Sequence, residues 1–342
     1  MQFPNYNRLA ALPFLDRLLP NWQENRPSSE DSQNKRGERP KIGLALSSGG
    51  AKGLTHIGVI QVLEEHQIPI DMIAGTSMGS YIGACWASGL TGKEMETLAG
   101  EIQTPRDRIH LLDPVFPPRK GFLRGHKVRK RLQKSIGERD FSELKIPLAV
   151  IATEMGTYRS HVIKTGNVAD AVHASSAIPG ICWPVEIDGS LFVDGGVANP
   201  LPVNALLEAG MDFIIAVNVI PSVSQLQAEK VRAAESEPPV SGLRRVSRWF
   251  NKHFNYFAAG NILDTLRSSA LGAQIRVAEF SGEQAHVHLR PSLCTGDWHD
   301  YHNSGKYIQA GRECAEAHLN EILALLEEPT SPNPSNPKLN HA

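Results

Sequence analysis

The five residues Gly75-Thr76-Ser77-Met78-Gly79 stand between a short apolar run, residues 70–74, and a helix-like segment, residues 80–88. A G-x-S-x-G sequence in this position is typical of a nucleophile elbow, in which a serine occupies a sharp strand-to-helix turn. Gly75 and Gly79 keep side chains out of the turn, and the N-terminus of the following helix offers positive partial charge to an anion. An ordinary turn can carry the same residues, so the flanking strand and helix are what favour the elbow.

A second motif, Ser48-Gly49-Gly50-Ala51-Lys52-Gly53, follows the apolar run 42–46 and opens a helix-like segment over 54–66. Its backbone amides suit an oxyanion or a phosphate group. A dinucleotide fingerprint needs a glycine where Ser48 stands, and a P-loop needs Ser or Thr where Gly53 follows Lys52. An oxyanion hole fits better, because the next strand presents Ser77 at its end.

The third motif, Asp194-Gly195-Gly196, follows the apolar residues 191–193 and places a carboxylate at the end of a strand. Asp-Gly is also a common β-turn sequence, so this motif alone indicates little. Further strands are expected at 147–153, 161–164 and 213–219. Strands that alternate with helices predict an α/β fold with a mainly parallel sheet covered on both faces.

The chain is expected to divide into four parts. Residues 23–40 are polar and charged and cannot bury enough apolar surface to offset the entropy of ordering, which predicts a flexible linker. An apolar N-terminal extension, residues 1–22, precedes it, and a disordered tail, residues 329–342, ends the chain. The folded body is expected over 41–328, including a helical C-terminal part.

Taken in this order, the three motifs resemble those of the patatin-like phospholipases, particularly the bacterial members. Lys52 stands where the family has Lys or Arg, and residues 56–59, 174–179 and 193–203 are similar to family segments. Ser48 stands where the family has glycine. The resemblance spans roughly residues 41–220 and implies a three-layer α/β/α fold.

The resemblance further implies a Ser–Asp dyad that hydrolyses acyl esters of phospholipids or lysophospholipids through an acyl-enzyme, without a metal or organic cofactor. Ser77 would be the nucleophile and Asp194 the proton acceptor. The oxyanion would be held by backbone amides, those of Gly49, Gly50, Ala51 and Met78. The remaining motif residues would support these groups: Ser48, Lys52, Gly53, Gly75, Gly79, Gly195 and Gly196. Lys52 would position the loop, meet an anionic head group, or be a solvated lysine at a helix end.

Three alternatives stay open. A histidine could complete a Ser-Asp-His triad of the α/β-hydrolase order, since four follow Asp194: His286, His288, His299 and His302. The chain could be a catalytically weak regulatory or interaction protein on the same fold. It could also bind a nucleotide through the Gly-rich loop.

The composition of the chain bears on its binding partners and on its cellular compartment. The chain has 35 Lys and Arg against 36 Asp and Glu, which argues against a nucleic-acid binder with a broad basic face. It has no run of 18 apolar residues and no apolar signal segment with a cleavage site, so a cytoplasmic protein is expected. Four scattered cysteines fit reduced thiols: Cys85, Cys182, Cys294 and Cys314. The sequence indicates neither an oligomeric state nor a lipid head group.

Two segments are candidates for peripheral membrane contact at the inner face of the membrane. Residues 243–257 combine apolar residues at helical spacing with four basic residues, as in an interfacial helix, although a surface helix packed on the core has the same pattern. The N-terminal extension carries a second apolar cluster, which Pro13 interrupts.

Overall fold

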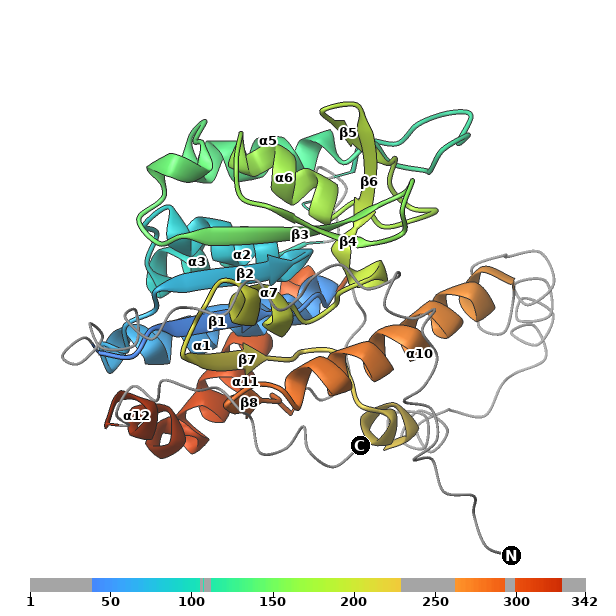
Figure 1. Cartoon of the computed structure of the whole chain (residues 1–342). Helices are drawn as coiled ribbons and strands as arrows, with labels where there is room; N and C mark the ends of the chain where they lie inside the picture. Colours follow the sequence, from blue (N-terminus) through green and yellow to red (C-terminus); the bar gives the residue numbers. More distant parts are fainter. Residues whose placement is uncertain (1–38, 105–106, 108–111, 229–261, 293–298, 328–342) are drawn as a thin grey trace, which may run out of the picture. The chain divides into compact units, whose positions relative to one another are not determined.

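The computed structural model describes residues 39–104, 107, 112–228, 262–292 and 299–327. They contain an eight-stranded sheet in the order β5-β6-β3-β2-β1-β7-β8, with β4 also paired to β3 (Figure 1). The strands are β1 (Ile42–Leu46), β2 (Met72–Thr76), β3 (Leu148–Glu154), β4 (Ser160–Ile163), β5 (Val185–Ile187), β6 (Ser190–Asp194), β7 (Phe213–Val217) and β8 (Val287–Leu289). The helices are α1 (Thr55–Glu65), α2 (Met78–Ala87), α3 (Gly92–Gly100), α5 (His126–Ile136), α6 (Val168–Ser175), α7 (Val203–Glu208), α10 (Ile262–Gly282), α11 (Ser304–Ala317) and α12 (Leu319–Glu327).

The sheet has a parallel centre and an antiparallel edge. Strands β3, β2, β1, β7 and β8 run parallel in that order, as the alternation of strands and helices predicts. Strands β4 and β6 pair antiparallel with β3, and β5 pairs antiparallel with β6. Hairpin turns rather than crossover helices join β3 to β4 and β5 to β6, so these strands reverse direction.

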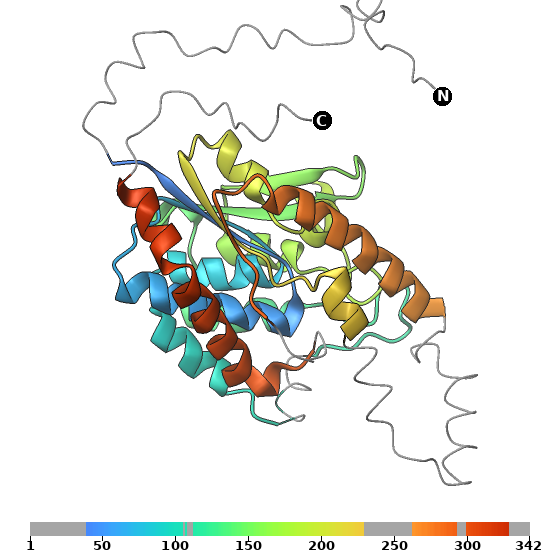
Figure 2. The ribbon, with the colours of Figure 1, turned by 90° about the horizontal axis from the view of Figure 1, so that it is seen from below.

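Alternating side chains of the central strands build one core on each face of the sheet. In β1, Ile42, Leu44 and Leu46 belong to the core under α1, α2, α5, α6 and α11, while Ala45 belongs to the core under α7 and α10. Figure 2 shows α10 on one side of the sheet and α11 with α1 on the other. The body is therefore a three-layer α/β/α arrangement, as expected from strands buried on both faces.

Helix α11 packs closely on α1, the helix that follows the Gly-rich loop. A Cβ on Gly58 of α1 would collide with the carbonyl of Ile308, and a Cβ on Gly311 of α11 would collide with that of Thr55. At the far end of this contact, Arg312 pairs with Glu65, with Nη1 2.8 Å from Oε1. The C-terminal helices are thus part of the same core as the motifs near the start of the body.

Several expectations fall outside the described residues. They are the N-terminal extension 1–22, all but the last two residues of the linker 23–40, the amphipathic segment 243–257, and the tail 329–342. Among the helices that the structure describes, none is long and apolar enough to cross a membrane.

Candidate active site

Ser77 occupies a strained turn between β2 and α2. Its backbone has φ 55° and ψ −120°, a conformation that costs a non-glycine residue free energy of about 1–3 kcal/mol. A Cβ on Gly75 would lie 2.6 Å from the Cα of Ser80, and a Cβ on Gly79 would collide with the carbonyl of Leu46. The two glycines of the G-x-S-x-G pattern are therefore needed for the close passage of chain that the elbow requires.

A residue far along the chain holds the backbone of the elbow. The amide of Ser77 donates to Oγ of Ser175, 2.8 Å away, and that hydroxyl donates to the carbonyl of Ile151 on β3, 2.5 Å away. Ser175 is fully buried at the end of α6. Because this relay ties the turn to β3, it helps to keep Ser77 in its strained conformation.

The hydroxyl of Ser77 and the carboxylate of Asp194 are in direct contact. Ser77 Oγ donates to Asp194 Oδ2 at 2.7 Å, although 117 positions separate the two residues. The pairing of β3 brings them together: Thr76 of β2 lies opposite Ile151, and Asp194 of β6 lies opposite Ala152. Since β6 runs antiparallel, the carboxylate approaches from the direction opposite to that of the serine.

The carboxylate of Asp194 is buried, and each of its two oxygens accepts one hydrogen bond. The second oxygen, Oδ1, accepts from the amide of Gly196 at 2.7 Å, and the side chain of Thr153 donates to the carbonyl of Asp194 at 3.0 Å. Asp194 is only 6% exposed and Ser77 only 7%. Burial raises the pKa of the Asp194 carboxyl from 3.8 to about 6, against the opposing effect of the hydrogen bonds from Ser77 and Gly196. The group is therefore a stronger base than an ordinary aspartate and is still mostly ionised at neutral pH.

The Gly-rich loop lies against the elbow. Residues 50–54 form a 3₁₀ helix that leads into α1, with Gly49 at its N-terminal cap and Gly50 at φ 55°. A Cβ on Gly53 would lie 2.7 Å from the Cβ of Met78, so only glycine lets the loop approach the residue after Ser77 this closely. The first amides of a helix have no partner within it, and the end of the loop helix lies against Met78, the first residue of α2.

The structure adds detail on two residues of the loop. The amide of Ser48 donates to the carbonyl of Pro200 at 2.9 Å, so it is not available to an anion. Lys52 is only 8% exposed, so the interpretation as a solvated lysine at a helix end is wrong.

A buried histidine fixes the residue before the loop. His56 is fully buried, and its Nε2 lies 2.9 Å from the carbonyl oxygen of Ser47. Burial lowers the pKa of His56 to about 4, so the ring is neutral at neutral pH and donates this hydrogen bond through Nε2. The sequence places His56 in a family-like segment but gives no indication of this contact.

The four histidines considered for a triad take part in other contacts. His286 Nδ1 accepts from the amide of Ile214 at 3.1 Å, and His302 Nδ1 lies 3.2 Å from Asp300 Oδ1. His288 lies within β8, and His299 is exposed. Within the described ranges, the carboxylate of Asp194 takes its hydrogen bonds from Ser77 and Gly196 and none from a histidine. The geometry favours a two-residue arrangement over a triad.

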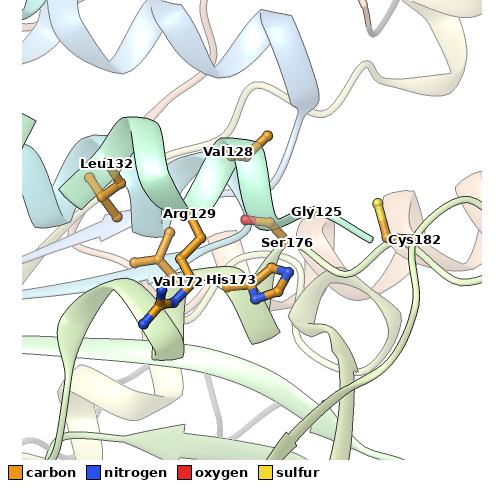
Figure 3. A pocket seen from close by; sticks show the side chains of 8 residues that line it. All are labelled: Gly125, Val128, Arg129, Leu132, Val172, His173, Ser176 and Cys182. Carbon is orange, nitrogen blue, oxygen red and sulfur yellow. The ribbon is translucent and has the colours of Figure 1, made fainter. Parts of the chain in front are cut away.

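A small cavity lies between α5 and α6 (Figure 3). Neither Ser77 nor Asp194 lines it, but Ser176 adjoins the Ser175 that holds the elbow. The lining is Gly125, Val128, Arg129, Leu132, Val172, His173, Ser176 and Cys182. Among the described residues, no group of three or more His, Cys, Asp or Glu is arranged to hold a metal ion.

The fold and the buried serine–aspartate pair define an α/β protein built around a strand-to-helix elbow. Comparison with known proteins agrees with the motifs. Residues 44–207, just under half of the chain, match the model of the patatin-like phospholipase family. The resemblance inferred from the three motifs and the fold class that it implied are confirmed.

Relatives extend this similarity over part of the chain. An uncharacterised NTE family protein of Mycobacterium tuberculosis is 36% identical over 225 residues, which is 66% of this chain and 61% of the relative. Lysophospholipase NTE1 of Saccharomyces cerevisiae is 31% identical over 182 residues, 52% of this chain and 11% of that protein. The chain thus spans less than two thirds of the mycobacterial relative and a small part of the fungal one.

The solved structures that this chain is similar to include VipD from Legionella pneumophila. It is 12% identical with a TM-score of 0.41, covering 84% of this chain and 67% of that one. The type III effector ExoU is 16% identical with a TM-score of 0.38, covering 83% of this chain and 53% of that one.

Proposed function

We propose that the protein is a serine lipid acyl hydrolase that cleaves carboxylic esters of phospholipids or lysophospholipids. The observation that carries the proposal is the 2.7 Å hydrogen bond from Ser77 Oγ to the buried carboxylate of Asp194 at a strained elbow. The match to the patatin-like phospholipase family and the similarity to fungal lysophospholipases support a lipid ester as substrate.

In the proposed mechanism, Ser77 Oγ attacks the ester carbonyl while Asp194 Oδ2 accepts its proton. The pKa of about 6 suits this role, because the carboxylate is ionised at neutral pH yet basic enough to assist the transfer. The proton then passes to the departing alcohol, which leaves an acyl group on Ser77. Water, activated by the same carboxylate, hydrolyses this acyl-enzyme and restores the serine.

Backbone amides would stabilise the negative charge that develops on the carbonyl oxygen. The candidates are the amides of Gly49, Gly50 and Ala51 at the loop helix and that of Met78 at the start of α2. The close contact of Gly53 with Met78 supports this assignment, because it packs the loop helix against the residue that directly follows Ser77. Loss of one such donor typically slows turnover about 100- to 1,000-fold.

The test is lipid analysis by mass spectrometry after incubation with mixed phospholipids and lysophospholipids. The wild-type protein should release fatty acid, and Ser77→Ala should release none while remaining folded by circular dichroism. Equal release by both proteins would exclude Ser77 as nucleophile. No release by the wild type from any lipid ester would favour the alternative, a regulatory or interaction protein on this fold.

A further inference from the structure

Residues 112–124, here called the 112–124 loop, expose large apolar side chains to solvent. Phe116 is 95% exposed, and Leu112 and Phe122 are each more than 40% exposed. Single exposed apolar residues are ordinary on a protein surface, but three of them within thirteen residues of chain make this loop a candidate contact surface. In Figure 1 the loop extends away from the body beside β5 and β6.

The same stretch of chain is strongly basic. From residue 112 to residue 136 there are eight Lys and Arg and one acidic residue, Asp113, although charges balance over the whole chain. The carboxylate of Asp113 accepts from the amides of Gly125 and His126 at 2.8 and 2.7 Å, at the start of α5. Six of the cations are exposed: Arg119, Lys120, Arg124, Lys127, Lys130 and Lys134.

Hydrogen bonds tie the loop to the segment that carries a partner of Asp194. The amides of Phe122 and Leu123 both donate to the carbonyl of Ile181, at 2.8 and 2.9 Å. Four residues earlier, the carbonyl of Ala177 accepts the amide of Asp194 at 2.9 Å. The exposed side chains are therefore carried by a fixed frame next to the serine–aspartate pair.

We propose that the 112–124 loop and the exposed basic side chains of α5 dock on an anionic phospholipid bilayer, with Phe116 entering the interfacial region. Exposed aromatic residues beside clustered cations are the combination that holds proteins at such interfaces. Each Lys or Arg near an anionic membrane surface strengthens binding about fivefold, and the attraction is screened by salt. Docking here would bring the serine–aspartate pair and the α5–α6 cavity toward the lipid.

The test is co-sedimentation of the full chain with vesicles of phosphatidylcholine mixed with phosphatidylglycerol. Carrying Ser77→Ala in every protein separates binding from hydrolysis, so the result does not depend on the proposed activity. The test variants are Phe116→Ser and the double variant Arg119→Gln/Lys120→Gln. The matched controls are Phe280→Ser on α10, which is 64% exposed, and Lys41→Gln/Lys93→Gln, which changes one exposed lysine just before β1 and one on α3.

We expect the double variant to bind mixed vesicles about 25-fold more weakly, from a fivefold contribution per cation, and Phe116→Ser about tenfold more weakly. The controls should bind like the parent, and added salt or pure phosphatidylcholine should reduce binding. Failure of the parent to bind mixed vesicles would overturn the proposal, as would equal binding by the test and control variants. A third result would also overturn the proposal: the test variants lose self-association in analytical ultracentrifugation but bind vesicles as the parent does. The surface would then contact a second copy of the chain.

Discussion

Replacement of the buried carboxylate by its amide, Asp194→Asn, should make the protein more stable while abolishing turnover. Asparagine has nearly the same shape, and its side-chain oxygen can still accept the hydrogen bond from the amide of Gly196. The variant differs mainly in having no charge to bury. The carboxyl pKa rises from 3.8 to about 6 on folding, and at about 1.4 kcal/mol per pH unit this corresponds to a cost of about 3 kcal/mol when the group is ionised.

The stability difference between Asp194→Asn and the wild type should depend on pH in a defined direction. Because the folded state holds the proton of Asp194 more tightly, the free energy of unfolding of the wild type falls as pH rises from about 4 to about 6 and is then level with respect to this group. Asparagine does not titrate. The stability advantage of Asp194→Asn should therefore be near zero at about pH 4 and reach about 3 kcal/mol above about pH 6.

The assay is urea unfolding of both proteins at several pH values, followed by circular dichroism. Glu186→Gln, which changes an exposed carboxylate on β5, serves as the matched control and should shift the free energy of unfolding by no more than about 0.5 kcal/mol. If Asp194→Asn is less stable than the wild type by the same amount at every pH, the reasoning about the buried charge is refuted.

Three further predictions follow from the same geometry. Since Asp194 must be ionised to accept a proton, kcat/KM on a soluble ester should rise with pH through an apparent pKa of about 6, and a flat profile would contradict the role as base. Ser175→Ala removes the acceptor of the Ser77 amide and should lower kcat about tenfold or more with KM little changed, as measured by steady-state kinetics. An unchanged kcat would mean that the turn at Ser77 keeps its conformation without this hydrogen bond. Gly58→Ala forces a methyl group against the carbonyl of Ile308 and should lower the free energy of unfolding by about 1–3 kcal/mol in urea, whereas the solvent-facing control Gly100→Ala should not.

The motifs that the sequence makes visible are those whose geometry is local. The elbow at Ser77 is visible because its two glycines lie two positions away and an apolar run stands just before it, although Gly79 is also needed for the close passage of Leu46 on β1. The strands expected at 42–46, 147–153, 161–164 and 213–219 appear within one or two residues, and all but the edge strand at 160–163 are buried apolar runs.

Features that depend on contacts between distant parts of the chain could not be predicted from local sequence patterns. Strands β5 and β8 have three residues each, too few for a periodic pattern, and the antiparallel direction of β6 depends on the hairpin with β5. The hydrogen bond from Ser77 to Ser175 joins residues 98 positions apart, and a serine at the end of a helix carries no signal of such a partner. The burial of Lys52 likewise has no local signal in the sequence.

The central claim, that Ser77 is a nucleophile activated by Asp194, is tested most directly by reaction with a fluorophosphonate probe followed by intact-protein and peptide mass spectrometry. The wild type should gain one adduct, located on Ser77, and Ser48→Ala, which removes the buried hydroxyl of the Gly-rich loop, should gain it equally. Ser77→Ala should gain none, and Asp194→Asn should react far more slowly. An adduct that persists in Ser77→Ala, or that lies on Ser48, would contradict the claim.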